Sequence, residues 1–458
     1  MVYIKINVPR LMIAAAGSNN GKTTITTALL KGFSMKGKKV AAYKCGPDYI
    51  DPMFHSEVIN VPSRNIDTFM LGENICRYVL GKNSKGADIS IIEGVMGYYD
   101  GIGHTTEASS YEISRLLNCP TVLVLDVNGM AVSACALIEG FQSFREGNNI
   151  KGVILNNISE GMYSYYRELI EKNTNIKVYG FLERLENCRL ESRHLGLVTA
   201  QEVGNLSDIV RELGENALKT IDMDGLYQLS LTAPELEYDE PVIERKGSVN
   251  IGLAYDKAFC FYYRDSLDVL EAMGANLVKF SPLSDRKLPE NISGLIFGGG
   301  YPELYMKELS QNKSMMEEIR KKVEEGMPVF AECGGYMYLL DSFKDEKDEY
   351  NLVGSAKGQS FMTKKLHNFG YVTLTANKDN LMCRKGGTIR AHEFHFSTST
   401  NLGNAFTATK PESGRTWNCI IAGEDRFMGY PHLHFLGNID FAQNFINKSI
   451  DYTKRQSI

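Results

Sequence analysis

Residues 10–33 read RLMIAAAGSNNGKTTITTALLKGF, and this stretch decides the fold of the first part of the chain. A short apolar run is followed by a loop containing Gly17 and Gly21, and then by a segment that can continue as a helix. The core GKTT is the signature of a phosphate-binding loop, in which backbone N–H groups at a helix N-terminus hold phosphate oxygens. In such a loop Lys22 reaches the terminal phosphates and Thr23 ligates Mg²⁺. The sequence therefore predicts a nucleotide site built on a strand, a loop and a helix.

The loop departs from the usual GxxxxGK[ST] spacing at its first glycine. That spacing calls for glycine at position 16, where this chain has alanine, while Gly17 lies one residue later. Variants of this kind occur in ATP-dependent ligases related to dethiobiotin synthetase. Because the strand, the loop and the helix start are all in place, nucleotide binding is favoured over an incidental Gly-Lys-Thr helix start.

Two clusters of polar residues accompany later apolar runs in the same half. They are YKCGPDYIDPMFH at 43–55 and IIEGVMGYYDG at 91–101. Both are predicted to lie at the carboxyl ends of strands, where open α/β sheets bind ligands. The side chains expected near the phosphates are Lys44, Asp48, Asp51, Glu93 and Asp100. Carboxylates there suit Mg²⁺, which takes oxygen ligands; the alternative is a proline-stiffened turn with solvated acids. His55 and His104 stand alone in the sequence and are given no catalytic role.

Apolar runs alternate with helical stretches along the whole chain. The runs are RLMIAAA, KVAAYKC, ISIIEGV, TVLVLDV and GVILNN in the first half, and VNIGLAY, ANLVKF, GLIFGGG and PVFAEC in the second. This alternation predicts α/β domains with parallel sheets covered on both faces. Residues 232–247, TAPELEYDEPVIERKG, are acidic, contain proline and lack apolar periodicity. They are interpreted as a linker between domains at 1–231 and 248–458.

The composition is that of a soluble globular protein with two or three domains. The 458 residues are 43% hydrophobic and 23% charged with a net charge of -5, so the basic excess typical of nucleic-acid binders is absent. No apolar run approaches the length needed to span a bilayer. The nine cysteines form no CxxC pairs, which argues against a disulfide framework or a zinc site. We expect a cytoplasmic protein with reduced thiols and with neither nucleic acid nor membrane as a partner.

Residues 328–335, PVFAECGG, place a cysteine directly after an apolar run and before two glycines. Gly334 and Gly335 would let the backbone turn sharply out of a buried strand. Such a turn exposes Cys333 at the carboxyl end of the strand, beside backbone N–H groups that can stabilise an oxyanion. The alternative is a small hydrophobic cysteine beside a turn.

Two further segments favour the catalytic interpretation of Cys333. FGGGYPELY at 297–305 is another strand-to-loop transition, with glycines whose backbone can approach a substrate closely. GYPHLHF, near the C-terminus, offers His432 and His434 as bases. Together these elements indicate a glutaminase, in which the histidine deprotonates the thiol, the thiolate attacks an amide and backbone N–H groups hold the oxyanion.

Along nearly its whole length the chain resembles the cobyrinate a,c-diamide synthase family, which are glutamine-dependent amidotransferases of cobalamin biosynthesis. The resemblance rests on motifs in matching order, which read GKTT, KCGPDYIDPMFH, EGVMGYYDG, GVILNN, SRHLGLV, AFCFYYRDSLDVL, FGGGYPE, AECGGYMYL, AHEFHFS and HLHF. GPDYIDP also separates the chain from the related cobyric acid synthases. The resemblance implies an N-terminal P-loop synthetase domain with a dethiobiotin synthetase-like parallel sheet. It also implies a C-terminal class I glutamine amidotransferase domain with a flavodoxin-like fold.

The resemblance further implies roles for single residues. Cys333 is the nucleophile and His432 its base, while His434 stands where many class I glutaminases carry glutamate and is the alternative base or the third triad member. Catalytic roles at the synthetase site go to Asp48, Asp51 and Asp100. ATP contacts go to Gly17, Asn20, Gly21, Lys22, Thr23, Thr24 and Asn156. Mg²⁺ ligands are Thr23, Asp48 and Glu93. Substrate contacts go to Lys44, Tyr49, Ile50, Arg193 and His194, and oxyanion contacts to Gly299, Gly300 and Gly334. Structural or substrate-shaping roles go to His392, Glu393 and His395.

The expected function is ATP- and glutamine-dependent amidation of the a and c acetate carboxylates of cobyrinate through acyl phosphates. The partners would be a corrinoid, glutamine and ATP, with Mg²⁺ as cofactor, and a homodimer is allowed. Nickel-sirohydrochlorin a,c-diamide synthase and a hydrogenobyrinate-specific enzyme use the same chemistry on related tetrapyrroles, so both stay open. A ParA-like nucleotide switch is a more distant alternative, which leaves Cys333 and the HLHF segment without a purpose.

Overall fold

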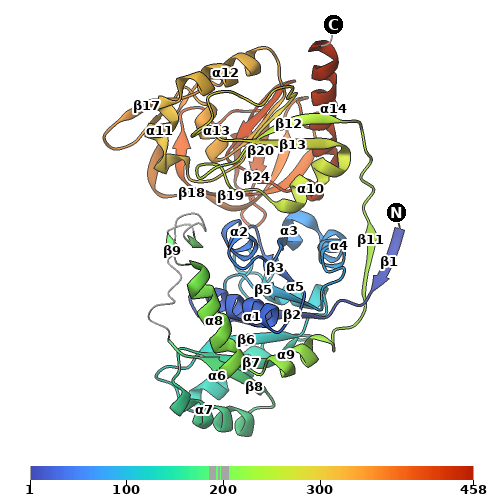
Figure 1. Cartoon of the computed structure of the whole chain (residues 1–458), viewed down its shortest axis with the longest axis vertical. Coiled ribbons are helices and arrows are strands. Elements are labelled where there is room, and N and C mark those ends of the chain that lie inside the picture. Colours follow the sequence, from blue (N-terminus) through green and yellow to red (C-terminus); the bar gives the residue numbers. More distant parts are fainter. Residues whose placement is uncertain (1, 185–191, 194–195, 198–205, 457–458) are drawn as a thin grey trace. The chain divides into compact units, whose positions relative to one another are not determined.

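The computed structural model divides the chain into two compact units, Met1–Pro241 and Val242–Ile458 (Figure 1). The structure describes all residues except 1, 185–191, 194–195, 198–205 and 457–458. Each unit contains its own cluster of buried apolar side chains, so each is described by itself. Within the described part of the chain, no helix combines the length and the apolarity needed to cross a bilayer.

A seven-stranded parallel sheet forms the centre of the first unit, in the order β4-β3-β5-β2-β6-β7-β8. Its strands are β2 (Arg10–Ala15), β3 (Val40–Cys45), β4 (Ser63–Ile66), β5 (Ile89–Glu93), β6 (Thr121–Asp126), β7 (Ile150–Asn156) and β8 (Lys177–Leu182). Strands β2, β3, β5, β6 and β7 coincide with the apolar runs read from the sequence. The prediction of a parallel α/β sheet is therefore confirmed. The strands could be recognised as apolar runs because both faces of such a sheet are buried.

Helices cover both faces of this sheet. They are α1 (Lys22–Met35), α2 (Ile50–Glu57), α3 (Thr68–Leu71), α4 (Glu73–Asn83), α5 (Ser110–Leu116), α6 (Ser133–Ser143), α7 (Glu160–Asn173), α8 (Leu206–Thr220) and α9 (Met223–Ser230). On one face, Ile13 of β2 shares a core with Leu29 of α1 and Leu213 of α8. On the other, the Tyr43 hydroxyl donates to the Leu80 carbonyl of α4. A short antiparallel pair, β9 (Ser192–Arg193) and β10 (Gly196–Leu197), lies between β8 and α8 in the sequence.

The segment predicted as a linker, 232–247, is partly a strand. β11 (Leu236–Glu240) pairs antiparallel with β1 (Val2–Ile6), and the division between the units falls after Pro241. Leu236 and Tyr238 are buried while Glu237 between them is exposed. The Tyr238 ring packs so closely on Gly81 of α4 that a Cβ atom there would lie 2.2 Å from it. This two-residue alternation is the strand signal that the acidic composition concealed.

The second unit contains a six-stranded sheet in the order β13-β12-β14-β15-β23-β22, parallel except for the last pair. The strands are β12 (Val249–Ala254), β13 (Ala275–Phe280), β14 (Leu295–Phe297), β15 (Val329–Glu332), β22 (Ile421–Ala422) and β23 (Arg426–Gly429). The helices of this unit are α10 (Arg264–Met273), α11 (Met306–Gln311), α12 (Lys313–Glu324), α13 (Gly334–Leu339) and α14 (Ile439–Gln456), with 3-10 turns η2 (Pro302–Leu304) and η3 (Phe435–Gly437). The α/β prediction is confirmed for this half as well.

A second, largely antiparallel sheet in the same unit was not predicted. Its strands are β16 (Ser342–Lys344), β17 (Glu349–Asn351), β18 (Gln359–Ala376), β19 (Thr388–Ser399), β20 (Phe406–Thr409), β21 (Thr416–Cys419) and β24 (His432–Leu433). In β19, every second residue is buried, including Glu393 and His395, so polar side chains occupy the inner face. Apolar runs do not reveal such a strand. The sheet brings β24, which carries His432, against β19.

Arg10 gives a test of this fold. Its fully buried guanidinium donates to the carbonyls of Leu117, Val8 and Pro234, which ties the start of β2 to two distant segments. Arg10→Met leaves these acceptors without a donor, so we expect the free energy of unfolding to fall by about 2–4 kcal/mol in urea titrations. Lys5→Met is the control, because Lys5 forms only exposed ion pairs with Glu235 and Glu237. Equal stability of both variants would contradict the assignment.

Candidate functional site

Gly21 closes the phosphate loop directly before α1. Its φ of 92° lies in the left-handed region that glycine adopts without strain. A Cβ atom at Gly21 would lie 2.1 Å from Nδ2 of Asn156, at the end of β7. Asn156 donates to the Asn20 carbonyl at 3.2 Å, and Asn20 donates to the Gly17 carbonyl at 3.1 Å. All of these residues were predicted to contact ATP, and hydrogen bonds connect Asn156 to the loop that carries Gly17, Asn20 and Gly21. Thr24 follows in the first turn of α1.

Lys22 spans the mouth of this loop. Its Nζ donates to the carbonyls of Gly17 at 3.0 Å and Met96 at 2.6 Å. Burial, assisted by the nearby charge of Lys44, lowers the pKa of Lys22 to about 8. An anion bound between the loop and the helix N-terminus would counteract both effects. The side chain is placed where a phosphate would be its natural partner.

Glu93, at the end of β5, is a fully buried carboxylate that joins three other segments. Its Oε1 accepts hydrogen bonds from Thr23 Oγ1 at 2.6 Å and from Lys44 Nζ at 2.9 Å. Nε2 of His55 lies 3.3 Å from its Oε2. Burial alone would raise the pKa of Glu93, but Lys44, His55 and the Thr23 hydroxyl together lower it, so the carboxylate is ionised. The sequence interpretation gave His55 no role, and its position on α2 against β5 is what brings it here.

The polar residues around α2 extend this cluster. Nζ of Lys44 lies 2.5 Å from Oδ2 of Asp51. Burial would lower the pKa of Lys44, but Asp51 and Glu93 raise it, so the ammonium stays charged. Burial and the Asp48 charge raise the pKa of Asp51, against the opposing effect of Lys44. Asp48 accepts from the backbone N–H groups of residues 50 and 51 at 2.8 and 3.2 Å, so it caps the start of α2.

The other residues predicted for the first site lie at its margins. Asp100 is exposed and accepts from the Gly97 N–H at 2.9 Å, in the loop that also supplies the Met96 carbonyl to Lys22. Tyr49 precedes α2 and Ile50 begins it. Arg193 belongs to β9, while His194 lies outside the described residues. Among the described residues, no group of three or more His, Cys, Asp or Glu side chains is arranged to hold a metal ion.

Cys333 lies at the sharp turn between β15 and α13 that the sequence predicted. Its φ of 44° and ψ of -104° are strained for a residue with a side chain. The Cys333 N–H donates to the Gly429 carbonyl of β23 at 2.7 Å, which fixes the turn. Burial and the Glu303 carboxylate raise the pKa of the Cys333 thiol, while a hydrogen bond from the Gly334 N–H lowers it. The thiol is therefore protonated in this state and needs a base to react.

The glycine-rich loop after β14 lies beside this turn. The Gly335 N–H donates to the Gly298 carbonyl at 3.0 Å. A Cβ atom at Gly334 would lie 3.4 Å from the Gly300 nitrogen, and one at Gly299 would lie 2.7 Å from Cε1 of His432. The three glycines predicted for the oxyanion site are thus gathered between Cys333 and His432.

His432 and His434 lie in different surroundings. His432, in β24, is opposite His392 of β19, and its Nδ1 lies 3.5 Å from Oε2 of Glu332. The His434 ring stacks on Tyr263 with centroids 4.8 Å apart, and its Nδ1 accepts from the Leu436 N–H at 3.3 Å. Burial lowers the pKa of His434 to about 3. The geometry favours His432 as the base, because His434 is engaged in the core.

The AHEFH motif forms a buried polar pair on the inner face of β19. Nε2 of His395 lies 2.9 Å from Oε2 of Glu393, and its Nδ1 lies 2.7 Å from the Ser397 carbonyl. The His395 ring stacks on Tyr430 with centroids 4.0 Å apart. These contacts agree with the structural or substrate-shaping role expected for the motif.

Comparison with known protein families gives one match in each half of the chain. A model of the CobQ/CobB/MinD/ParA nucleotide binding domain matches residues 11–198, and one of the CobB/CobQ-like glutamine amidotransferase domain matches residues 250–439. The cobyrinate a,c-diamide synthase of Caldanaerobacter subterraneus is 40% identical over 97% of this chain and 99% of its own length. The chain belongs to the cobyrinate a,c-diamide synthase family.

Further members of the cobyrinate a,c-diamide synthase family match to a similar extent. The protein from Clostridium tetani is 41% identical over 96% of this chain and 99% of its own, and that from Thermoplasma volcanium 39% over 99% and 100%. Solved structures are more distant. PurLQS from Thermotoga maritima gives a TM-score of 0.31 at 16% identity, covering 46% of this chain and 99% of its own. FtsY from Elizabethkingia anophelis gives 0.30 at 16%, covering 46% and 66%.

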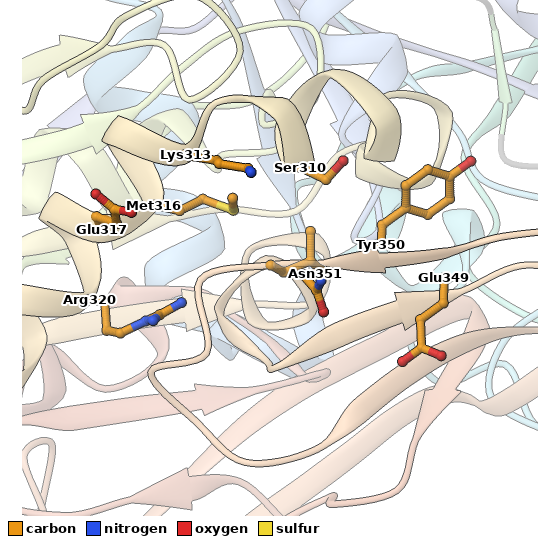
Figure 2. A pocket seen from close by; sticks show the side chains of 9 residues that line it. Ser310, Lys313, Met316, Glu317, Arg320, Glu349, Tyr350 and Asn351 are labelled. Carbon is orange, nitrogen blue, oxygen red and sulfur yellow. The ribbon is translucent and has the colours of Figure 1, made fainter.

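One pocket of about 330 Å³ in the second unit is lined by residues of α11, α12 and β17 (Figure 2). Lys313 and Arg320 of α12 and Glu349 of β17 are among its lining residues, so it carries charges of both signs. It shares no lining residue with the predicted site. We assign it no part of the family's reaction.

The buried His434 should make the free energy of unfolding depend on pH. With a folded pKa of about 3 and an unfolded value near 6.5, the unfolded chain binds more protons between these values. The free energy of unfolding should therefore fall as the pH drops below about 6.5, by about 2 kcal/mol at pH 5 from this group alone. His434→Asn keeps an acceptor for the Leu436 N–H and should be less pH-dependent by that amount in urea titrations. His104→Asn, at an exposed position, should keep the wild-type slope; identical slopes for all three proteins would contradict the assignment.

Proposed function

We propose that this protein catalyses the ATP- and glutamine-dependent amidation of the a and c acetate carboxylates of cobyrinate. The observation that carries the proposal is the presence, in one chain, of a phosphate loop bonded to Glu93 and of a strained cysteine whose preceding residue, Glu332, lies 3.5 Å from His432. Relatives that match this chain over nearly their full length bear the name of this activity. Cobalamin biosynthesis is the corresponding pathway.

In the glutaminase half, His432 takes the proton of the Cys333 thiol and the thiolate attacks the carboxamide carbon of glutamine. Backbone N–H groups at Gly334 and in the Gly299–Gly300 loop stabilise the oxyanion. As the C–N bond breaks, the imidazolium of His432 returns its proton to the leaving nitrogen, which departs as ammonia. Water then hydrolyses the thioester to glutamate and regenerates the thiol.

In the synthetase half, the acceptor carboxylate must be activated because its oxygen is a poor leaving group. Transfer of the terminal phosphoryl group of ATP would give an acyl phosphate and ADP. Ammonia then attacks the acyl carbon, so that the amide forms and phosphate leaves. Lys22 would offset negative charge on the transferring group, while Asp48, Asp51 and Asp100 would hold the substrate or the intermediate. Lys44, Tyr49, Ile50, Arg193 and His194 are the proposed contacts of the acceptor.

The residues at the phosphate loop fit Mg²⁺. Thr23 Oγ1 and Oε1 of the ionised Glu93 lie 2.6 Å apart beside the loop and are the proposed oxygen ligands. Asp48 is the further proposed ligand. Mg²⁺ in nucleotide sites takes one or two protein oxygens together with phosphate oxygens. When bound there, it would neutralise charge that develops on the phosphates.

Cobyrinate is the proposed acceptor, while nickel-sirohydrochlorin and hydrogenobyrinate stay alternatives that the same machinery could amidate. A ParA-like switch stays remote, because it gives no purpose to the strained Cys333 or to the HLHF segment. A cytoplasmic location and a homodimer stay predictions.

The two half-reactions should separate on mutation of the nucleophile. Cys333→Ala is expected to lower glutamine-supported amidation by at least about 10³-fold, because no thioester can form, while amidation from ammonium salts persists. Cys383→Ala, at a half-buried cysteine outside the site, should leave both activities intact. Product amides are counted by mass spectrometry. Loss of both activities in a folded Cys333→Ala protein would overturn the assignment of separate sites.

The identity of the acceptor can be tested by offering each macrocycle in a separate reaction. With ATP, Mg²⁺ and glutamine, we expect two carboxyl-to-amide conversions on cobyrinate and little conversion of nickel-sirohydrochlorin or hydrogenobyrinate in parallel reactions. Mass spectrometry of each macrocycle measures the result. Preferential conversion of the nickel compound would keep the mechanism and replace the acceptor, whereas glutamine hydrolysis without any amidation would overturn the acceptor class.

A further inference from the structure

We propose that Glu332 is the positioning residue that orients His432 and stabilises its cation during glutamine hydrolysis. The inference rests on the proposed function, since it assumes that His432 is the base for Cys333. The sequence left open which residue completes this pair, because the usual glutamate position is occupied by His434.

The Glu332 carboxylate is held in two directions. It belongs to the last residue of β15, directly before the nucleophile, and is buried. Its Oε1 accepts from the Leu433 N–H at 2.6 Å, which anchors it to the residue after His432. Its Oε2 lies 3.5 Å from His432 Nδ1, at the outer range of an ion pair. Contacts of catalytic pairs are often long without substrate and tighten in the complex.

This arrangement selects one protonation state of the imidazole. A carboxylate beside Nδ1 favours a proton on that nitrogen, so that the unprotonated Nε2 can accept the thiol proton. The same negative charge stabilises the imidazolium that forms when the proton arrives. It also opposes ionisation of the neighbouring Cys333 thiol, so its benefit is confined to the state in which His432 carries the proton.

The other groups near His432 are less suited to this role. From β19, His392 faces it, and burial together with the His432 charge lowers the His392 pKa to about 3, so His392 is neutral. From the loop after β14, Gly299 presents only backbone. His434 on the same segment bonds the Leu436 N–H instead. Among these neighbours, Glu332 alone supplies a negative charge.

Glu332→Gln tests the proposal with little change in shape. The amide oxygen can still accept from the Leu433 N–H, which turns the amide nitrogen toward His432 and forces the proton to Nε2. We expect kcat for glutamine hydrolysis to fall by about 10²-fold or more, with KM within about twofold. A purely structural role would instead lower kcat only together with the free energy of unfolding, which urea titrations of the same variant measure.

Controls separate this proposal from the proposed function. Glu318→Gln removes a carboxylate that likewise accepts from a backbone N–H, that of Leu288, and should keep wild-type kcat. If Cys333→Ala retains glutamine hydrolysis, the proposed function fails. If Cys333→Ala is inactive while Glu332→Gln keeps wild-type kcat, only the role of Glu332 is overturned. Should Glu332→Gln not fold, Glu332→Asp keeps the charge but withdraws it by one methylene; a kcat reduced about tenfold supports positioning, and an unchanged kcat overturns it.

Discussion

The first unit depends on a buried negative charge at the carboxyl end of β5. A fully buried carboxylate is tolerated only when it is paired and hydrogen-bonded, and removal of one partner typically costs about 3–5 kcal/mol. Glu93 meets this condition through the Thr23 hydroxyl, the Lys44 ammonium and the nearby His55 ring. These partners come from α1, β3 and α2, which converge because β2, β3 and β5 are neighbours in one parallel sheet. The same constraint that satisfies the charge therefore assembles the phosphate site.

In the second unit, backbone strain has the corresponding role. A residue with a side chain at a φ of 44° is disfavoured by about 1–3 kcal/mol, and Cys333 keeps this conformation because its surroundings fix it. Its own N–H is bonded to β23, and the Gly335 N–H is bonded to the loop after β14. Glycines at 334 and 335 are needed there, since a Cβ at Gly335 would lie 2.4 Å from the Phe297 carbonyl oxygen. The turn brings the predicted oxyanion glycines beside Cys333, whose side chain is buried and not exposed as the sequence predicted.

Much of this could be read from the sequence, for a physical reason. Strands such as β2 and β6 are buried on both faces and stand out as continuous apolar runs, so the parallel sheets and the residues at their carboxyl ends were predictable. The antiparallel sheet was missed because β19 buries polar residues, including Glu393 and His395, on the same face as Ile389 and Ala391, so no apolar run stands out. His55 was given no role because it lies on α2, whereas its partner Glu93 lies on β5 and is distant in the sequence. The relation of Glu332 to His432 depends on the pairing of β15 with β23, which periodicity does not reveal.

In both units, burial shifts the pKa of one site residue toward its neutral form: it raises the pKa of the Cys333 thiol and lowers that of Lys22. In the second unit, burial and the nearby Glu303 carboxylate raise the pKa of the Cys333 thiol, so in the proposed mechanism the nucleophile forms only when His432 accepts the proton. In the first, Lys22 is held by two backbone carbonyls in a buried position that lowers its pKa. Neutral carbonyls compensate an ammonium less than phosphate does. A bound phosphate would therefore compensate the Lys22 ammonium better than the two carbonyls do, while in the proposed mechanism the Cys333 thiolate forms only on proton transfer to His432.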